Sequence, residues 1–400
     1  MKGTCLPTFT ASAHSSRRNN SLPPFEFQPL GRVVFEPGAI SRLGELTRSV
    51  GGTRALLVTD PGLWSAGHPQ RAADSLTRAG LEVFTFDGVK ENPTEREVAA
   101  GVATAREYQI DVIVAVGGGS SMDCAKGVNF ILTNGGRMAD YKGFGKATKP
   151  MLPSVGVPTT AGTGSEAQCY ALITDESSHM KMACGDKKAA FRVAVLDPEV
   201  TLSQPRAVTA FTGLDAVAHA IESFVCTKAN PFSRVYSLAA WRHLEPNFER
   251  VLDEPTDLAA RGAMLLGAHF AGMAIESAML GVCHSCANPL TAHYGITHGV
   301  AIGLLLPHVV RFNGPAAGEA YAELVAETAS LNGEPPAETL AKRMAEMGRA
   351  AGLPASLREC GVSESILPLL AHEANQQWTA RFNPRPVTEA DIETIYRAAW

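Results

Sequence analysis

The 400-residue sequence lacks an excess of positive charge, since 35 Lys and Arg stand against 40 Asp and Glu for a formal net charge of −5. A protein whose main partner is nucleic acid or an anionic membrane usually carries a basic surface, so neither partner is expected. Apolar stretches such as DVIVAVGGG (111–119) are short and broken by glycine. We therefore expect no transmembrane segment, because a spanning helix needs about 20 apolar residues.

Cysteine is too sparse for a disulfide framework. The eight cysteines are scattered along the chain, at positions 5, 124, 169, 184, 226, 283, 286 and 360. In a chain of this length that pattern is typical of a reducing compartment, so a cytoplasmic location is expected. Cys283 and Cys286 form a CxxC pair around His284, which leaves a redox or zinc role open; we favour small buried thiols.

Acidic residues are absent from the first 25 positions, which contain Arg17, Arg18, several Ser and Thr, and paired prolines. This composition predicts a disordered arm over residues 1–25. It is also compatible with an organelle-targeting peptide, or with a start codon placed too far upstream. Residues 1–25 are therefore left out of the predicted fold.

What the sequence does contain, from Gly31 onward, is an alternation of strand-like and helix-like segments. Apolar runs such as RALLV (54–58) alternate with amphipathic stretches such as TEREVAAGVATAREY (94–108). Such alternation predicts a parallel sheet with helical crossovers. After residue 207 the strand signals almost vanish, and the Ala- and Leu-rich sequence has helical spacing. We therefore predict an α/β, Rossmann-like dinucleotide-binding domain over residues 26–207 and an all-α domain over residues 208–400.

Gly117, Gly118, Gly119 and Ser120 stand between the predicted strand DVIVAV and the helical segment SMDCAKG. Glycine lets the backbone approach a phosphate, and the free amides at the start of a helix favour an anion. A tight turn without a ligand is the alternative, but three consecutive glycines exceed what a turn needs. The segment lacks the GK[ST] of a Walker motif and does not match GxGxxG, so ATP use is not supported.

A second glycine-containing stretch, VPTTAGTGSEA (157–167), follows another apolar run and places Thr159, Thr160 and Ser165 in a loop. Small hydroxyl side chains and glycines can wrap a pyrophosphate or a ribose. Taken alone, the same loop could equally be structural. This stretch therefore supports nucleotide binding only together with the first glycine loop.

Asp60 ends the predicted strand ALLVTD (55–60). An acidic side chain at a strand end can accept hydrogen bonds from ribose hydroxyls and repels a 2′-phosphate, which favours NAD over NADP. Capping of a following helix is the alternative role for such a residue.

Two further segments contain the residue types of a mononuclear metal site. Asp215 and His219 are four residues apart, which places a carboxylate and an imidazole on one face of a helix. His284 and His298 would lie about 21 Å apart on an unbroken helix at 1.5 Å per residue, so the chain between them must turn back. Pro289 and Gly295 offer the break. One carboxylate and three imidazoles suit Fe(II) or Zn(II) better than Mg or Ca.

In four segments that occur in the same order, the chain resembles the iron-containing (group III) alcohol dehydrogenases. The segments are GGGSSMDCAK (117–126), PTTAGTGSE (158–166), GLDAVAHAIES (213–223) with TKANP (227–231) after it, and HYGITHGVAIGLLLPH (293–308). The resemblance extends from about Phe27 to the C-terminus. Dehydroquinate synthase and glycerol dehydrogenase share this fold with other ligand sets, and the Asp-x3-His and His-x13-His spacings point to the alcohol dehydrogenase branch.

The resemblance implies a dehydroquinate synthase-like fold, a divalent metal that is usually Fe(2+) and sometimes Zn(2+), NAD as the cofactor, and a homodimer or higher homo-oligomer. The implied metal ligands are Asp215, His219, His284 and His298. Residues assigned to NAD binding, from the residues themselves or from the resemblance, are Asp60, Asn92, Gly117, Gly118, Gly119, Ser120, Asp123, Thr159, Thr160, Ser165 and Lys181.

One departure from the family pattern concerns proton transfer. Many relatives carry a second histidine four residues after the third metal ligand, whereas this chain has Asn288 there. An amide can bond a substrate hydroxyl but cannot exchange a proton near neutral pH. The alternatives for the proton route are a water chain, the nicotinamide ribose and His293, which could equally be a structural helix residue.

The expected function is hydride transfer between NAD and a small primary alcohol or its aldehyde, assisted by the metal. The alternative is a hydroxyacid–oxoacid transhydrogenase that holds its nucleotide tightly. A lyase like dehydroquinate synthase needs a cleft rich in Lys and Arg, and the helical metal segments show few such residues beyond Lys228. A non-catalytic binder is disfavoured because four candidate ligands accompany an intact glycine loop.

Overall fold

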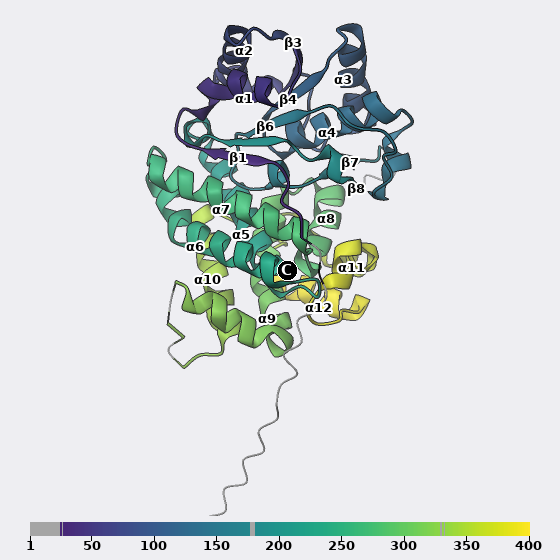
Figure 1. Cartoon of the computed structure of the whole chain (residues 1–400). Helices are drawn as coiled ribbons and strands as arrows, with labels where there is room; N and C mark the ends of the chain where they lie inside the picture. The colour runs from purple at the N-terminus through teal and green to yellow at the C-terminus, as the bar shows by residue number, and fades with distance from the viewer. Residues whose placement is uncertain (1–24, 26, 177–180, 329, 332) are drawn as a thin grey trace, which may run out of the picture.

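The computed structural model describes residues 25, 27–176, 181–328, 330, 331 and 333–400. An α/β half, purple to teal in Figure 1, lies on top of a helical half drawn in green and yellow. The arm predicted over residues 1–25 lies outside the described residues, apart from Phe25. The predicted fold class, a parallel-sheet domain followed by a helical one, is confirmed.

A six-stranded sheet in the order β1-β9-β6-β4-β2-β3 forms the centre of the α/β half, and all of its pairings are parallel. Most of these strands are apolar and buried, as expected when helices cover both faces. The strands are β1 (Arg32–Phe35), β2 (Arg54–Val58), β3 (Glu82–Phe86), β4 (Val112–Gly117), β6 (Ser154–Pro158) and β9 (Val193–Leu196).

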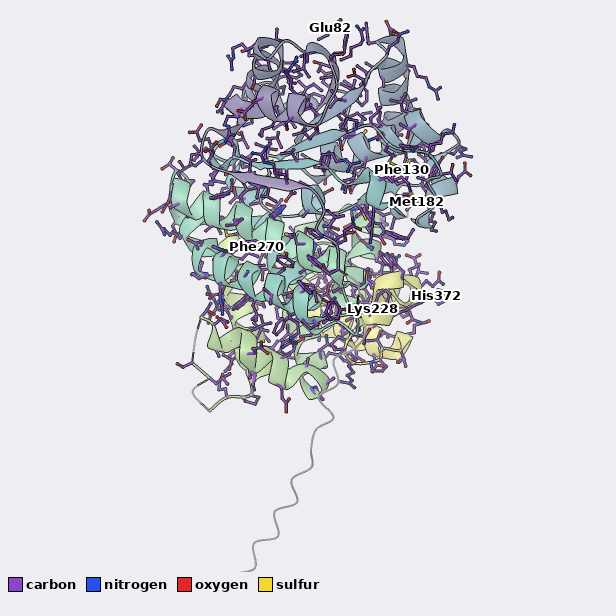
Figure 2. All side chains as sticks on the ribbon, in the orientation of Figure 1. Glu82, Phe130, Met182, Lys228, Phe270 and His372 are labelled. Carbon is purple, nitrogen blue, oxygen red and sulfur yellow. The ribbon has the colours of Figure 1, made fainter. Side chains whose placement is uncertain are left out.

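Helices cover the two faces of this sheet in pairs, each pair over its own apolar core. One core joins β2 and β4 to α1 and α2; the other joins the opposite faces of these strands to α3 and α4. Phe130 and Met182, labelled in Figure 2, belong to the second core. The helices are α1 (Leu43–Ser49), α2 (His68–Arg78), α3 (Glu95–Glu107) and α4 (Gly119–Asn134).

The strand order reverses between β2 and β4, because β3 lies outside β2 and the chain then returns to the other side of β2. In open parallel sheets, ligands bind at the carboxyl ends of the strands beside such a switch point. Asp60 follows β2, and Gly118 and Gly119 follow β4. The topology therefore brings the predicted nucleotide residues to one edge of the sheet.

A second, three-stranded sheet was not predicted. It has the order β5-β8-β7, with β5 (Gly143–Phe144), β7 (Tyr170–Thr174) and β8 (Lys181–Gly185). In the antiparallel pairing of β7 with β8, Thr174 lies directly opposite Lys181. This small sheet therefore fixes Lys181 at the side of the α/β half.

The helical half packs around one apolar core, with α5 in contact with α6, α7 and α9. Its helices are α5 (Arg206–Val225), α6 (Pro231–Asp253), α7 (Leu258–Ser277), α8 (Val282–Tyr294), α9 (His298–Ala326), α10 (Pro336–Ala351), α11 (Leu367–Gln376) and α12 (Glu389–Ala399). Short 3-10 helices are η1 (Ala39–Arg42), η2 (Pro61–Leu63), η3 (Met138–Tyr141), η4 (Ser165–Ala167), η5 (Lys187–Ala189), η6 (Pro198–Thr201), η7 (Glu364–Ile366) and η8 (Trp378–Phe382).

By length and composition alone, α7 could cross a membrane, which the sequence analysis did not recognise. Within the protein, 67% of its apolar window is buried, and the helix packs closely against α6. Burial of this kind is usual for a core helix of a globular domain.

The turn between the third and fourth predicted metal ligands occurs at Gly295 and not at Pro289. Pro289 lies inside α8, which continues to Tyr294, so the prediction that this proline breaks the helix was wrong. Proline removes one backbone hydrogen bond, and the packing of α8 against α9 and α11 outweighs that loss. Gly295 ends α8 in the left-handed conformation, with φ of 63°.

Gly299, the residue after His298, lets α9 approach α5 closely. A Cβ atom at this position would lie 2.0 Å from the backbone oxygen of Phe211 in α5. No side chain fits there, so the glycine determines how near His298 lies to the ligands on α5. At Gly318, further along α9, a Cβ atom would meet nothing within 4 Å.

The Gly299→Ala variant is expected to unfold more easily, because the added methyl group separates α9 from α5. The free energy of unfolding should fall by about 1–3 kcal/mol, as in other overpacked cores. Urea denaturation measures this change. The matched variant Gly318→Ala should be unchanged or slightly more stable, because alanine favours the helix. An equal fall in the free energy of unfolding for both substitutions would show that the close approach of Gly299 to Phe211 does not contribute to stability.

Candidate metal centre and cofactor cleft

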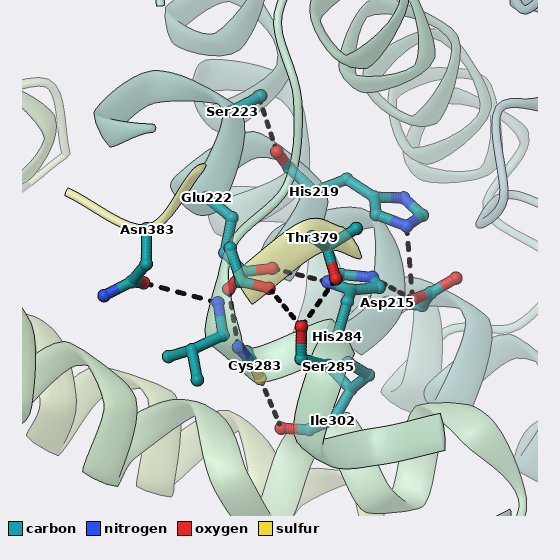
Figure 3. Close-up of polar contacts among 12 residues, drawn as sticks. Asp215, His219, Glu222, Ser223, Cys283, His284, Ser285, Ile302, Thr379 and Asn383 are labelled. Atoms are coloured by element: carbon teal, nitrogen blue, oxygen red, sulfur yellow. Dashed lines mark hydrogen bonds and ion pairs between the residues drawn. The ribbon is translucent and has the colours of Figure 1, made fainter. Parts of the chain in front are cut away.

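The four predicted metal ligands meet in the helical half, although they come from three helices. Asp215 and His219 lie one turn apart on α5, His284 lies in the first turn of α8, and His298 is the first residue of α9. The Nε2 atoms of the three histidines lie 3.4, 3.3 and 3.7 Å from a single oxygen, Oδ1 of Asp215. Figure 3 shows Asp215 between the rings of His219 and His284.

This cluster is largely buried, and its members shift one another's pKa values in different directions. Asp215, His219 and His284 are each 6% exposed. Burial by itself would raise the pKa of Asp215, but the imidazoles, His219 first, outweigh it and hold that pKa well below its usual range. Burial would lower the pKa of His284, but Asp215 and Glu222 together raise it to about 9. Burial lowers the pKa of His298 to about 3, so that one ring nitrogen of the neutral imidazole is available to a cation.

The cluster fits a divalent metal in spacing and in ligand type. Ligand atoms of Asp215, His284 and His298 all lie within 4.8 Å of one another. Zinc–ligand bonds of about 2.0–2.1 Å in a tetrahedral site place neighbouring ligand atoms roughly 3.4 Å apart. The distances to Asp215 are close to that value, and the ligand set suits Fe(II) or Zn(II).

Glu222, which the sequence analysis missed, lies directly behind this cluster. Its Oε2 is 2.5 Å from Nδ1 of His284, and its Oε1 accepts a hydrogen bond of 2.8 Å from the backbone N–H of Cys283. A signal was present in the sequence, because Asp215, His219 and Glu222 have the i, i+4, i+7 spacing of one helix face. Figure 3 shows Glu222 reaching from α5 to the start of α8.

The first glycine loop forms the N-terminus of α4 and leaves its first amides without a side-chain cap. A Cβ atom at Gly118 would lie 3.3 Å from Cγ2 of Thr160, and one at Gly119 would lie 2.7 Å from Cγ2 of Thr163. The glycines thus form a cradle that side chains would fill, at the end of α4 where the first backbone amides lack a side-chain cap. This arrangement fits the pyrophosphate of a dinucleotide. Ser120 is partly buried, and its Oγ accepts a 3.3 Å hydrogen bond from the N–H of Asn92.

The second loop connects the glycine loop to the helical half. A Cβ atom at Gly162 would lie 2.5 Å from Cβ of Thr212 in α5, three residues before Asp215. Thr159 is buried, and its N–H donates to the backbone oxygen of Gly117 at 2.9 Å. The predicted second cofactor loop therefore lies between the first loop and the metal cluster.

Asp123 and Ser165 have contacts that hold the loops in place. The Oγ of Ser165 donates to Asp123 at 2.6 Å and accepts from the ammonium of Lys126 at 2.8 Å. Lys126 is almost completely buried and also donates to the backbone oxygens of Ser165 and Tyr170. These bonds occupy the Ser165 hydroxyl, so the structure gives Asp123 and Ser165 a supporting position behind the cradle rather than a place on its surface.

Asp60 caps η2, the alternative role considered for it: Oδ1 accepts a 3.0 Å hydrogen bond from the N–H of Gly62. Its Oδ2 lies 3.5 Å from where a Cβ atom at Gly117 would be. Burial raises the pKa of Asp60, which is half-buried beside the loop. The cap leaves Oδ2 beside the glycine cradle.

A cavity of about 180 Å³ lies between the two halves. Asn288 and Thr291 line it from α8, one and two turns beyond His284, and Asn288 donates a 3.2 Å hydrogen bond to the side chain of Gln377. The remaining lining residues are Asn92, Thr174, Lys181, Ala292 and Gln377. The structure thus brings Asn92, Lys181 and Asn288 together, and no motif in the sequence pointed to Thr174 or Gln377.

His293, the other candidate for proton transfer, does not line this cavity. It lies in the last turn of α8, with its side chain 33% exposed and Nε2 2.8 Å from the carboxylate of Glu373. Cys283 and Cys286 are free and fully buried in the helical core, in agreement with the interpretation as small buried thiols. Of the two residues predicted to act in catalysis, the geometry therefore favours Asn288.

Comparison with known proteins agrees with this arrangement. The sequence model described as "Iron-containing alcohol dehydrogenase" matches residues 31–198, and that described as "Fe-containing alcohol dehydrogenase family, C-terminal" matches residues 209–400. The 1,3-propanediol dehydrogenase of Klebsiella pneumoniae is 37% identical, over 92% of this chain and 96% of that protein. The NAD-dependent methanol dehydrogenase of Bacillus methanolicus is 34% identical, over 92% and 97%.

The crystal structure of a 1,3-propanediol oxidoreductase superposes with a TM-score of 0.92 and 36% identity, covering 94% of this chain and all of that one. Both halves of the chain match the family models, and the ligand cluster, the glycine cradle and the cavity lie where the two halves meet. The chain therefore belongs to the iron-containing alcohol dehydrogenase family.

Proposed function

We propose that this protein is a metal-dependent oxidoreductase that transfers a hydride between NAD and a small primary alcohol or its aldehyde. The observation that carries the proposal is the convergence of three histidine Nε2 atoms on one oxygen of Asp215, in a chain whose α4 begins at a glycine loop without a side-chain cap. The names of the relatives, a methanol dehydrogenase that uses NAD and a 1,3-propanediol dehydrogenase, support the same chemistry.

Each group of residues has a defined task in this proposal. Asp215 and the three histidines hold the metal, and the amides of Gly119 and Ser120 bind the pyrophosphate. Asp60 accepts a hydrogen bond from the adenosine ribose. When bound, the metal supplies a Lewis acid for the alcohol or carbonyl oxygen, and the nicotinamide supplies or accepts the hydride.

The cavity between the halves is the proposed substrate site. Its lining residues are polar except for Ala292 and offer amides, hydroxyls and the ammonium of Lys181, which suits a small substrate with oxygen atoms to bond. Asn288 can donate to a substrate oxygen but cannot carry a proton near neutral pH, so we assign proton exchange to water within the cavity.

We propose Fe(2+) as the resident ion at a site that also accepts Zn(2+), because imidazole and carboxylate ligands suit both. We further propose a cytoplasmic homodimer without nucleic acid or membrane as a partner. The free cysteines of the described residues suit a reducing compartment, and the net charge is −5. Val33 and Phe35, each 42% exposed on the edge strand β1, support association with a second copy.

Metal analysis of protein purified without oxygen, with an NAD-reduction assay on short primary alcohols and diols, tests the function. We expect about one Fe or Zn per chain, as one set of four ligands implies, and turnover that a chelator abolishes and added metal restores. A protein that contains metal and binds NAD but turns over no alcohol would contradict the proposal. Ping-pong kinetics with a nucleotide that does not dissociate would instead indicate the transhydrogenase.

The His284→Ala variant is expected to lose metal and turnover while its NAD affinity stays nearly unchanged, because this side chain lies in the metal cluster and not in the glycine cradle. Metal content by mass spectrometry and NAD binding by calorimetry measure the two effects. His372→Ala, which changes an exposed histidine paired with Glu389, is the control and should behave as wild type. Activity that survives in His284→Ala would refute the ligand assignment.

The Asp60→Gly variant is expected to reduce the preference for NAD over NADP about 10- to 100-fold, because a hydrogen bond to a charged acceptor is worth about 1.5–3 kcal/mol. Glycine is tolerated at the start of a short helix, so loss of the η2 cap should cost only a few tenths of a kcal/mol. The ratio of kcat/KM for the two cofactors measures the effect. An unchanged ratio would remove Asp60 from the ribose site.

A further inference from the structure

We propose that Glu222 is a positioning residue for the metal: its carboxylate fixes the ring orientation and the tautomer of His284 and thereby sets the metal affinity of the site. The inference rests on the proposed function, in that His284 is taken as a metal ligand. It concerns a residue that touches neither cofactor nor substrate and acts only through the histidine.

The contact between Glu222 and His284 determines which ring nitrogen carries the proton. Oε2 of Glu222 lies 2.5 Å from Nδ1 of His284, and both side chains are almost completely buried. An ionised carboxylate can only accept a hydrogen bond, so Nδ1 must be the donor. In the neutral imidazole the lone pair is then on Nε2, the atom that lies 3.3 Å from Oδ1 of Asp215.

The other carboxylate oxygen is held just as firmly. Oε1 accepts the backbone N–H of Cys283 at 2.8 Å, which also satisfies one of the free amides at the start of α8. A Cβ atom at Gly281 would lie 2.8 Å from this oxygen, so only glycine leaves room for the carboxylate. With one oxygen on the helix terminus and one on the ring, Glu222 cannot rotate without losing a bond.

The three histidine ligands are not equivalent in this respect. Within the described part of the chain, the Nδ1 atom of His298 is buried and has no hydrogen-bond partner. His284, by contrast, has the carboxylate of Glu222 hydrogen-bonded to its Nδ1 atom.

Glu222 and Asp215 together also bring two negative charges to the metal site, which equal the charge of a divalent ion. The loss of Glu222 should therefore weaken binding by disordering the ring and by removing one balancing charge.

The Glu222→Gln variant tests the inference. Its single carbonyl oxygen can accept from the N–H of Cys283 or from Nδ1 of His284, but not from both. If it bonds Cys283, the amide group faces Nδ1 and favours the tautomer with the proton on Nε2. Both arrangements lose one balancing negative charge, and the one that bonds Cys283 also reverses the tautomer, so the dissociation constant for Co(2+) or Zn(2+) should rise by about 10- to 100-fold, as for other groups behind metal ligands. Competition with a chromophoric chelator measures this constant in the whole protein.

The matched control is Asn383→Ala. Asn383 accepts a 3.3 Å hydrogen bond from the N–H of Val282, the amide next to the one that Glu222 binds, and lies at the same end of α8 without touching His284. If Glu222 acts through the ring, metal affinity in this control should stay near that of wild type. An equal loss of affinity in both variants would show that capping of α8 explains the effect, and would overturn the inference.

Two spectroscopic measurements distinguish a change in the orientation of the His284 ring from a general loss of protein stability. The visible absorption spectrum of the Co(2+) form should change in Glu222→Gln, because the ring of His284 shifts relative to the metal, and stay unchanged in Asn383→Ala. If Glu222→Gln does not fold, 15N-histidine NMR of the wild-type zinc form decides: a proton on Nε2 of His284 would overturn the inference. Failure of the proposed function is distinguishable, since it would show as absent turnover or absent metal in the wild-type protein, whereas the inference concerns the change in metal affinity from wild type to Glu222→Gln.

Discussion

The burial of one carboxylate, Asp215, among three imidazoles is the constraint on which the helical half depends. Burial of an unpaired carboxylate costs several kcal/mol even after the protein relaxes. The three histidines compensate for that cost only if α5, α8 and α9 approach closely enough for their Nε2 atoms to surround one oxygen. Gly299 permits the approach of α9 to α5, and Glu222 connects α5 to the first turn of α8. Apolar packing stabilises the association of the helices, and the contacts of Asp215 with the three histidines determine how α5, α8 and α9 are positioned relative to one another.

The two halves meet through loops that are tightly packed rather than simply adjacent. Gly162 contacts Thr212 of α5, and a Cβ atom at Gly164 would lie 2.7 Å from Cα of Gly272 in α7. On its other side, the same loop packs Thr160 and Thr163 against the glycine cradle. A shift of the cradle is therefore transmitted within a few ångströms to the turn of α5 that precedes Asp215. This close packing explains why the loop within VPTTAGTGSEA (157–167) contains so many small residues. From the sequence alone, that loop could have been either a nucleotide-binding or a purely structural element.

The sequence predicted the features that arise from local pattern. The alternation of apolar runs and amphipathic helices predicted the large parallel sheet, and the spacing of Asp215 and His219 placed both on one helix face. The prediction that Pro289 breaks the helix was wrong because the sequence shows only the local cost of a proline within a helix. The packing of α8 against other helices, which outweighs that cost, is a tertiary feature. The position of Lys181 opposite Thr174 depends on the register of a small sheet that the sequence did not reveal. Glu222 had the spacing of a ligand-bearing face, yet its partner lies 62 residues away in the sequence.

The order of the strands has a consequence for how the chain folds during its synthesis. β1 occupies the edge of the large sheet, and its one partner among the described residues is β9, about 160 residues later in the sequence. At a translation rate of about 5–20 residues per second, the ribosome needs roughly 8–30 s to make the intervening chain. Throughout that interval the first strand has no partner, while β2, β3 and β4 can already pair with one another. The sheet is therefore built from the β3 edge toward the β1 edge, and its first strand in the sequence is added last.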